Sequence, residues 1–490
     1  MQLSRTTRDK RAGQIGRLIE EASRGRAMAQ ARRQYPINDK DQIESPRQGH
    51  FPNFPLALRP QGRAAAGLNL ARLRAGKRNV AEMADIAGLS RPPANDGADP
   101  RPRAVSVSTQ GLQRAGFTAL TAVPVGEWRA LAERAIEPNG YYLPAWELAV
   151  NASAHGRTDV LALGAWRKAL PASGEAAPLI GLLPVVSLWR ACKIPLPALA
   201  SASPYGTLCT PLLDRGLAEE AAKGLLNEAR AIGAHALILR DVSLSGAAMK
   251  AITQALRQDG LQPIILHSHL RACLDARRDA DEVLRDALGA KKLKELRRQR
   301  NRLAEHGAVR FEIARHPTDI GRAIETFLAL EASGWKGERG TALRQDEGDA
   351  SFIRRATRGL AETGQCEIVT MHAGDTPVAA AIVLRHQDRA FYFKLGIDER
   401  FAKFSPGVQL TLELTRHLCA DAVLVTADST ASAHHPMINP IWRGRLRIGD
   451  VILPLRHHDP VVPVIHAAMK MRHRLRDLAR RAVHPLRAAK

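Results

Sequence analysis

The sequence predicts a mixed α/β fold, in which two copies of one helix-and-sheet unit leave a cleft between them. Three apolar segments, Glu367–Met371, Val378–Arg385 and Ala390–Gly396, are separated by turn residues, which predicts an antiparallel meander. A similar order of elements occurs earlier in the chain, where Gly156–Trp189 matches Gly364–Gly396 in pattern. We expect a ligand site at the cleft, because interfaces between such units favour binding.

Length and charge narrow the range of partners. At 490 residues, the chain is too long for a single hydrophobic core. Its hydrophobic fraction of 45% is that of a globular protein. A formal net charge of +23 predicts polyanionic partners, such as nucleic acid, an anionic membrane face or a phosphorylated cofactor. Aromatic residues make up only 4% of the chain, so few side chains can stack on single-stranded bases and nucleic acid is not favoured.

Cysteine usage and hydropathy indicate the compartment. The five cysteines are scattered and form no Cys-x-x-Cys pair, which indicates reduced thiols in a cytosolic protein and argues against a zinc site. No apolar run is long enough to span a membrane, and the N-terminus carries no apolar secretory segment. We therefore expect a cytoplasmic protein without a metal, which could also contact the inner face of the membrane.

Composition divides the chain into four regions. Residues 1–110 form a basic, largely disordered tail, because they hold too few large apolar residues for a core. Residues 111–280 form the N-terminal unit, and residues 281–456 form the C-terminal unit. Residues 457–490 form a basic amphipathic helix, which could lie on an anionic membrane or pack on the second unit with a solvated outer face.

Both units read as helices alternating with strands. Periodicity is clearest in Thr318–Ala332, where Ile320, Ile324, Phe327 and Leu328 share one face. The N-terminal unit is expected to contain helices Val125–Ala135, Pro144–Ala152, Leu217–Ala231 and Ser245–Gln258, and strands Asp159–Trp166, Leu179–Leu188 and Ala236–Asp241. The C-terminal unit adds helices Asp281–His306, Phe352–Glu362 and Ser405–Cys419, the loop Glu331–Gly340, and strands Val309–Ala314 and Ala422–Ala427.

The rest of the chain is organised around the stretch Phe391–Leu414. A strand and a charged loop lead into Ser405 and Pro406, which supply a hydroxyl at the N-cap and a preset φ at the first helical position. Free N–H groups and the dipole at a helix start favour an anion, and Gly407 would let a ligand approach the backbone. The plainer alternative is an ordinary capped helix.

Several short motifs follow one another in the C-terminal unit. They are Leu296-Arg297-Arg298, Glu331-Ala332-Ser333-Gly334-Trp335-Lys336-Gly337, Tyr392-Phe393-Lys394, Ser405-Pro406-Gly407 and His435-Pro436-Met437-Ile438. In this order and spacing they resemble the GNAT acyltransferase superfamily. The resemblance extends from about Val125 to Leu455 and is greatest to the FemAB-like branch, in particular to bacterial acetyltransferases of the cellulose- or polysaccharide-biosynthesis type.

The resemblance implies acyl-CoA as cosubstrate, with its pyrophosphate held at the helix start by Ser405, Gly407, Val408 and Gln409. The chain departs from the family pattern here, because the usual glycine-rich loop is reduced to Ser-Pro-Gly and Pro406 donates no N–H. Relatives in the FemAB-like branch use aminoacyl-tRNA instead, so both donors stay open.

Acyl transfer needs a deprotonated nucleophile, a stabilised carbonyl oxygen and a protonated leaving group. Asp398 follows the last meander strand and could be the base. Lys394 lies four residues earlier, on the same predicted face, and could stabilise the oxyanion. Tyr392, on that face too, could protonate a thiolate, as the resemblance implies. The alternative for Lys394 and Asp398 is an ion pair at the sheet edge.

Candidate substrate-binding residues lie in two loops. Trp335 and Lys336 could form an exposed binding wall, or Trp335 could anchor its loop to the core. Asp428 and His435 flank a polar loop after the last strand, where His435 could be a base or a structural turn residue.

We therefore predict an acyltransferase that moves an acetyl or acyl group from acyl-CoA to an amine or hydroxyl of a small-molecule or sugar-linked acceptor, in polysaccharide or cell-envelope biosynthesis. Two alternatives are a transferase that uses aminoacyl-tRNA, and a non-catalytic basic binding protein with a degenerate GNAT core.

Overall fold

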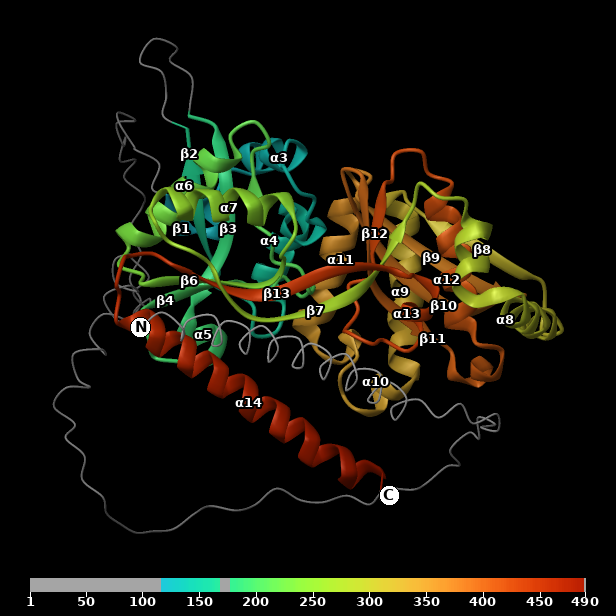
Figure 1. The fold of residues 1–490 in the computed structure, drawn as a ribbon. Coiled ribbons are helices and arrows are strands. Elements are labelled where there is room, and N and C mark those ends of the chain that lie inside the picture. The colour runs from blue at the N-terminus through green and yellow to red at the C-terminus, as the bar shows by residue number, and fades with distance from the viewer. Residues whose placement is uncertain (1–115, 168–176, 489–490) are drawn as a thin grey trace, which may run out of the picture. The chain divides into compact units, whose positions relative to one another are not determined.

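The computed structural model describes residues 116–167 and 177–488 (Figure 1). The predicted basic tail, residues 1–110, lies outside the described residues. The strands are β1 (Phe117–Ala119), β2 (Leu161–Trp166), β3 (Leu179–Ser187), β4 (Ala198–Ser201), β5 (Leu212–Leu213), β6 (Ala236–Ser243), β7 (Ile264–Asp275), β8 (Val309–Ala314), β9 (Cys366–Ala373), β10 (Thr376–His386), β11 (Arg389–Ile397), β12 (Thr426–Asp428) and β13 (Gly444–Pro454).

Helices cover both faces of the sheet. The α-helices are α3 (Val125–Glu133), α4 (Pro144–Ser153), α5 (Leu188–Cys192), α6 (Ala218–Ala231), α7 (Ala247–Gln258), α8 (Ala280–Ala304), α9 (Pro317–Ser333), α10 (Trp335–Glu338), α11 (Glu347–Ala361), α12 (Pro406–Cys419), α13 (Ile438–Ile441) and α14 (Val461–Ala488). The short 3-10 helices are η1 (Leu120–Ala122), η2 (Gly140–Tyr142), η3 (Leu343–Gln345) and η4 (Glu399–Phe404).

The described strands form one mixed sheet whose two halves repeat the same pattern. The strand order is β1-β2-β3-β4-β6-β13-β7-β12-β11-β10-β9-β8, with β5 beside β3. In the first half β2, β3 and β4 are antiparallel, and β4 pairs in parallel with β6, which follows α6. In the second half β9, β10 and β11 are antiparallel, and β11 pairs in parallel with β12, which follows α12. The mixed α/β fold and the repeated pattern predicted from the sequence are confirmed.

Two long strands join the halves. β13 pairs with β6 of the first half and with β7, and β7 pairs with β12 of the second half. Figure 1 shows both strands running from one half to the other. Neither strand is among those predicted from the sequence. Where the sequence predicts the loop Glu331–Gly340, α9 continues to Ser333 and α10 follows, and the predicted strand Ala422–Ala427 begins ahead of β12.

The halves share a hydrophobic core where α4 packs against α11. The ring centroid of Trp146 in α4 lies 4.9 Å from that of Phe393 and 5.1 Å from that of Phe352. Tyr141 is fully buried and lies 5.8 Å from Phe391 in the same way. Aromatic side chains from both halves therefore fix β11 against the first half, which sets the position of the residues that follow Phe391.

None of the described helices is both long enough and apolar enough to cross a membrane.

Candidate active site

A cleft of about 310 Å³ opens where β11 and β12 separate. The two parallel strands pair only through Arg389–Phe391 and Thr426–Asp428, so the second part of β11 lacks this neighbour. The cleft is lined by Lys336, Tyr392, Phe393, Lys394, Leu395, Ile397, Ser429, Thr430, Ala431, His435, Met437 and Ile438. One wall is thus β11, and the opposite wall is the chain that follows β12.

A β-bulge in β11 decides which side chains face which helix. Ile382 of β10 pairs with Lys394 and Val383 pairs with Tyr392, so Phe393 is an extra residue in the ladder. The Tyr392 hydroxyl lies 3.2 Å from Thr411 Oγ1 in α12, whereas Lys394 reaches α9. The prediction that Tyr392 and Lys394 share one face is therefore wrong, because the bulge breaks the alternation.

Lys394 is held by a buried carboxylate. Its Nζ lies 3.2 Å from Glu331 Oε1, and the Nζ of Lys336 lies 3.2 Å from the same oxygen. The Glu331 side chain is fully buried, and its Oε2 accepts a hydrogen bond from the Leu343 N–H at 3.0 Å. Lys336 Nζ also donates to the carbonyl of Leu395 at 3.2 Å. Two ammonium groups converge on one carboxylate at the cleft wall.

The charges of this cluster do not cancel. Burial opposes ionisation of Glu331, but Lys394, Lys336 and the Leu343 N–H together hold its pKa below the usual value. Burial lowers the pKa of Lys336, and the neighbouring carboxylate opposes that shift. With one carboxylate for two lysines, the cluster carries excess positive charge into the cleft and suits a negatively charged group there.

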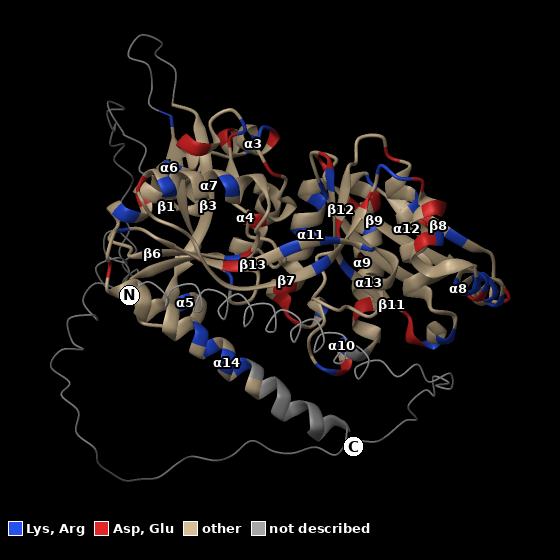
Figure 2. Ribbon diagram, viewed as in Figure 1, with Lys and Arg blue, Asp and Glu red and all other residues tan. Residues whose placement is uncertain are grey.

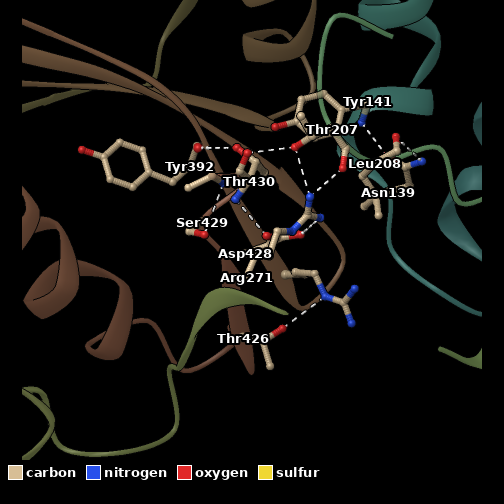
Figure 3. Close-up of polar contacts among 12 residues, drawn as sticks. Asn139, Tyr141, Thr207, Leu208, Arg271, Tyr392, Thr426, Asp428, Ser429 and Thr430 are labelled. Atoms are coloured by element: carbon tan, nitrogen blue, oxygen red, sulfur yellow. Dashed lines mark hydrogen bonds and ion pairs between the residues drawn. The ribbon is translucent and has the colours of Figure 1, made fainter. Parts of the chain in front are cut away.

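Tyr392 contributes its backbone to the cleft and its side chain to the core. The side chain is buried on the α12 side, and burial raises its pKa. Its carbonyl accepts a hydrogen bond of 2.6 Å from the Thr430 hydroxyl, which ties β11 to the opposite wall (Figure 3). The phenol hydroxyl therefore contacts α12 through Thr411, which does not line the cleft.

Asp398 caps the short helix η4 and does not line the cleft. Its carboxylate accepts hydrogen bonds from the Arg400 backbone N–H at 3.0 Å and from Arg400 Nη2 at 2.7 Å. These bonds lower the pKa of Asp398. An ion pair between Lys394 and Asp398, the structural alternative that the sequence allowed, is also wrong, because each has a different partner.

The start of α12 lies behind the cleft wall. Ser405 is at the N-cap in a left-handed conformation, and its side chain makes no capping bond. Gly407 is buried against Leu395 and Ile397, and a Cβ there would come within 2.9 Å of Leu395 Cδ2. Of the four predicted cofactor residues, Ser405, Gly407, Val408 and Gln409, none lines the cleft.

Gln409 points to a second groove, of about 630 Å³, between α8 and α12. Its Nε2 donates to the Leu296 carbonyl at 2.8 Å. The groove is basic, and its cations are Arg285, Lys294, Arg297, Arg300 and Arg416. Arg300 and Arg416 are paired with Glu413, so the remaining basic side chains give the groove its positive charge.

Asp428 supports the wall opposite β11. Its Oδ2 lies 2.5 Å from Nη2 of Arg271, and both side chains are buried. Its Oδ1 accepts a hydrogen bond from the Thr430 N–H at 2.8 Å, and Arg271 donates to the Thr207 carbonyl at 2.6 Å (Figure 3). Asp428 therefore positions the loop that carries Ser429 and Thr430, and does not itself line the cleft.

His435 lines the same wall and faces the cleft from the chain after β12. It is half-buried, and burial lowers its pKa. The Ile438 N–H approaches His435 Nδ1 at 3.4 Å. Lys336 lies in the lysine cluster, as described above. Trp335 begins α10, and its side chain lies outside the described residues.

Two residues beside Lys394, Glu331 and Tyr205, are not among the site residues predicted from the sequence. Glu331 was part of a motif but had no assigned role, although an acidic residue on the apolar face of Thr318–Ala332 was a signal of a buried charge. Tyr205 comes from the first half: its ring centroid lies 5.6 Å from Lys394 Nζ, and its hydroxyl donates to Asp349 at 2.5 Å. Tyr205 has a positive φ of 62°, which projects its ring from a tight turn.

One group of described side chains could hold a metal ion. The ligand atoms of His267, Asp450 and His473 lie within 4.8 Å of one another. Four basic residues line the same pocket: Arg240, Lys470, Arg474 and Arg476. Their charges oppose a dication, and none of the three ligands lines the cleft, so we assign this group no part in the reaction.

Comparison with known proteins agrees with the cleft's position. Residues 290–431 match the acetyltransferase (GNAT) domain family. This range runs from α8 to the loop after β12 and includes most of the cleft. The GNAT resemblance is thereby confirmed for this part of the chain, and it supports acyl transfer. No curated protein matches the chain.

Solved structures with a similar arrangement are distant. The crystal structure of FemX is 13% identical, with a TM-score of 0.45, over 70% of this chain and 98% of that one. The C-terminal domain of a putative lysylphosphatidylglycerol synthetase from Agrobacterium fabrum is 11% identical, with a TM-score of 0.42, over 70% and 95%. A tandem GNAT protein from the clavulanic acid biosynthesis pathway is 15% identical, with a TM-score of 0.34, over 70% and 99%. Likenesses this distant assign no function.

Proposed function

We propose that the protein is an acyltransferase whose reaction takes place in the cleft between β11 and β12, within the C-terminal unit predicted for residues 281–456. The observation that carries the proposal is the convergence of Lys394 and Lys336 on the buried Glu331 at the cleft wall. A cleft with excess positive charge favours a transition state in which an acyl carbonyl oxygen becomes negative.

The cleft residues supply the parts of an addition–elimination reaction. An acceptor amine or hydroxyl attacks the acyl carbon, and the carbonyl oxygen becomes an oxyanion beside the Lys394 ammonium. His435 on the opposite wall accepts the proton of the nucleophile, since its lowered pKa keeps it neutral near pH 7. The tetrahedral intermediate then collapses and the leaving group takes a proton, which the Lys336 ammonium of the cleft wall donates.

The proposed donor is acyl-CoA, acetyl-CoA in the simplest case. Its diphosphate would be held by basic side chains and not by the backbone at the helix start, because Pro406 has no N–H and Gly407 is buried. The proposed acceptor is a small molecule or a sugar-linked precursor of polysaccharide or cell envelope, which the resemblance implies. Because acyl-CoA is a cytoplasmic metabolite, we propose a cytoplasmic location.

Aminoacyl-tRNA is the second candidate donor. The observations that favour it are the buried start of α12 and the basic groove of about 630 Å³ between α8 and α12. A tRNA backbone would suit that groove, because the groove offers cations and no aromatic platform for bases.

Thermal-shift and release assays distinguish these proposals. A donor that binds the folded protein raises its unfolding temperature by mass action. We expect acyl-CoA, and not free adenosine, to do so, and acceptor-dependent release of CoA thiol to follow. Lys394→Ala should lower the rate about 100-fold or more. Lys403→Ala, at an exposed position in η4, is the matched control and should retain the rate.

Two outcomes would contradict the first proposal. Stabilisation by charged tRNA alone, lost as salt is raised, would replace acyl-CoA by aminoacyl-tRNA. Stabilisation by neither donor, together with salt-dependent binding to any polyanion, would leave a non-catalytic binding protein.

A further inference from the structure

α14 has two apolar faces, and among the residues that the structure describes only one of these faces is packed. Val462, Ile465 and Met469 are buried in a cluster with side chains of the sheet and α5, such as Ile452 and Leu188. This contact fixes the first turns of α14 against the first half of the fold. It explains why these three residues of α14 are apolar, but not why further apolar residues lie on the exposed side of the helix.

The second apolar face is exposed. Val464, Met471, Leu475 and Leu478 are 53%, 55%, 58% and 60% exposed. Their spacings of seven, four and three residues place them in one stripe along the helix. Scattered exposed leucines are normal, but a continuous apolar stripe on a fixed helix indicates a surface that binds something.

Basic residues lie on both sides of this stripe. At 100° per residue, Lys470 and Arg474 lie on one side, and Arg472 and Arg476 lie on the other, where Arg472 Nε also donates to the Cys192 carbonyl at 3.1 Å. From Val461 to the end, the chain contains eight Lys or Arg residues and one acidic residue, Asp477. Figure 2 shows the basic residues of the described part of α14 in blue.

We propose that this face of α14 binds an anionic phospholipid surface, with the helix in the plane of the membrane interface. An apolar stripe flanked by cations is the pattern of helices that bury one face at the boundary between headgroups and acyl chains. The cations then lie at the level of the lipid phosphates. This inference does not rest on the proposed enzymatic activity.

The same features disfavour the other occupants. A second copy of the chain would bring two strongly basic faces together, which their repulsion opposes. RNA would satisfy the arginines, but its phosphate backbone gives no reason for four apolar side chains in a row. A lipid surface satisfies both the stripe and its charged edges.

Vesicle sedimentation with the full-length protein tests the proposal. Vesicles of phosphatidylcholine alone are compared with vesicles that also contain phosphatidylglycerol. We expect binding to the anionic vesicles only. The double variant Leu475→Ser/Leu478→Ser should lower the partition coefficient about 100-fold, since each buried leucine contributes about tenfold or more. Lys470→Gln/Arg474→Gln should lower it about 25-fold at low salt, at about fivefold for each cation.

The matched controls are Val423→Ser and Leu270→Ser, which remove exposed apolar side chains elsewhere on the surface. Both should bind like wild type, and all variants should keep the wild-type unfolding temperature, because the changed side chains are exposed. Unchanged binding of Leu475→Ser/Leu478→Ser would overturn the proposal and assign lipid binding to basic residues elsewhere. A dimer or an RNA complex that the leucine variant abolishes, without vesicle binding by wild type, would also overturn it.

Discussion

Replacing Glu331 by Gln removes the charge from the centre of the lysine cluster and leaves its size unchanged. At 3.2 Å and an effective dielectric constant of about 20, one ammonium–carboxylate pair is worth about 5 kcal/mol before desolvation is counted. Removing one partner of a buried pair costs about 3–5 kcal/mol. The side chains of Lys336 and Lys394 are 24% and 22% exposed, so water still solvates them in part. We therefore expect the free energy of unfolding to fall by about 3 kcal/mol, near the lower end of this range.

The loss should depend on pH. Glu331 raises the pKa of Lys336, which burial already lowers, so the pKa falls further in Glu331→Gln. Between a lowered folded-state pKa and the unfolded value near 10.4, the unfolded chain binds more protons, and stability rises with pH. The difference in free energy of unfolding between wild type and Glu331→Gln should therefore become smaller between about pH 7 and pH 10.

Urea unfolding followed by the fluorescence of the buried tryptophans measures this free energy. The matched control is Glu325→Gln on the same helix, where Glu325 pairs with Arg354 but both side chains are about half exposed. Such a surface pair contributes less than about 1 kcal/mol. Two results would contradict this: Glu331→Gln lowers the free energy of unfolding no more than Glu325→Gln does, or lowers it by an amount that does not change with pH. Either result would show that the ion pairs of Glu331 with Lys336 and Lys394 do not stabilise the fold.

Three further results are expected. Asp428→Asn should lower the free energy of unfolding by about 3 kcal/mol, because Arg271 is left as a buried cation, and urea unfolding would show whether it does. The value of kcat/KM should be constant near pH 7 and fall as pH drops through a pKa below 6.5, and His435→Gln should remove this limb; an unchanged pH profile would exclude His435 as the base. Tyr392→Phe should keep more than about half of kcat, since its hydroxyl contacts Thr411 outside the cleft, and a loss of about 100-fold would contradict this placement.

Local patterns were enough to predict much of the fold. The apolar spacing of Ile320, Ile324 and Phe327 predicts α9, and these side chains are buried on one face. Turn residues predict the meander of β9, β10 and β11, which the structure shows with the same order. Element type follows from periods of two and 3.6 residues, and these are visible in a short window.

The site could not be read in the same way, because it depends on pairing between distant residues. The bulge at Phe393 exists only in the register with β10, and it turns Lys394 toward α9. Glu331 and Lys394 are 63 residues apart, so no local pattern joins them. No local pattern marks Arg271 as buried, because its burial depends on Asp428, 157 residues later.

Photolabelling tests the central claim most directly, because it needs no knowledge of the acceptor. A photoreactive acyl group, carried by CoA in one experiment and by tRNA in the other, is bound, activated and mapped by mass spectrometry. With one of the two carriers, the account predicts labels on Tyr392–Ile397 or Ser429–Ile438, the two walls of the cleft. Labels confined to other surfaces with both carriers, such as the groove between α8 and α12, would contradict it.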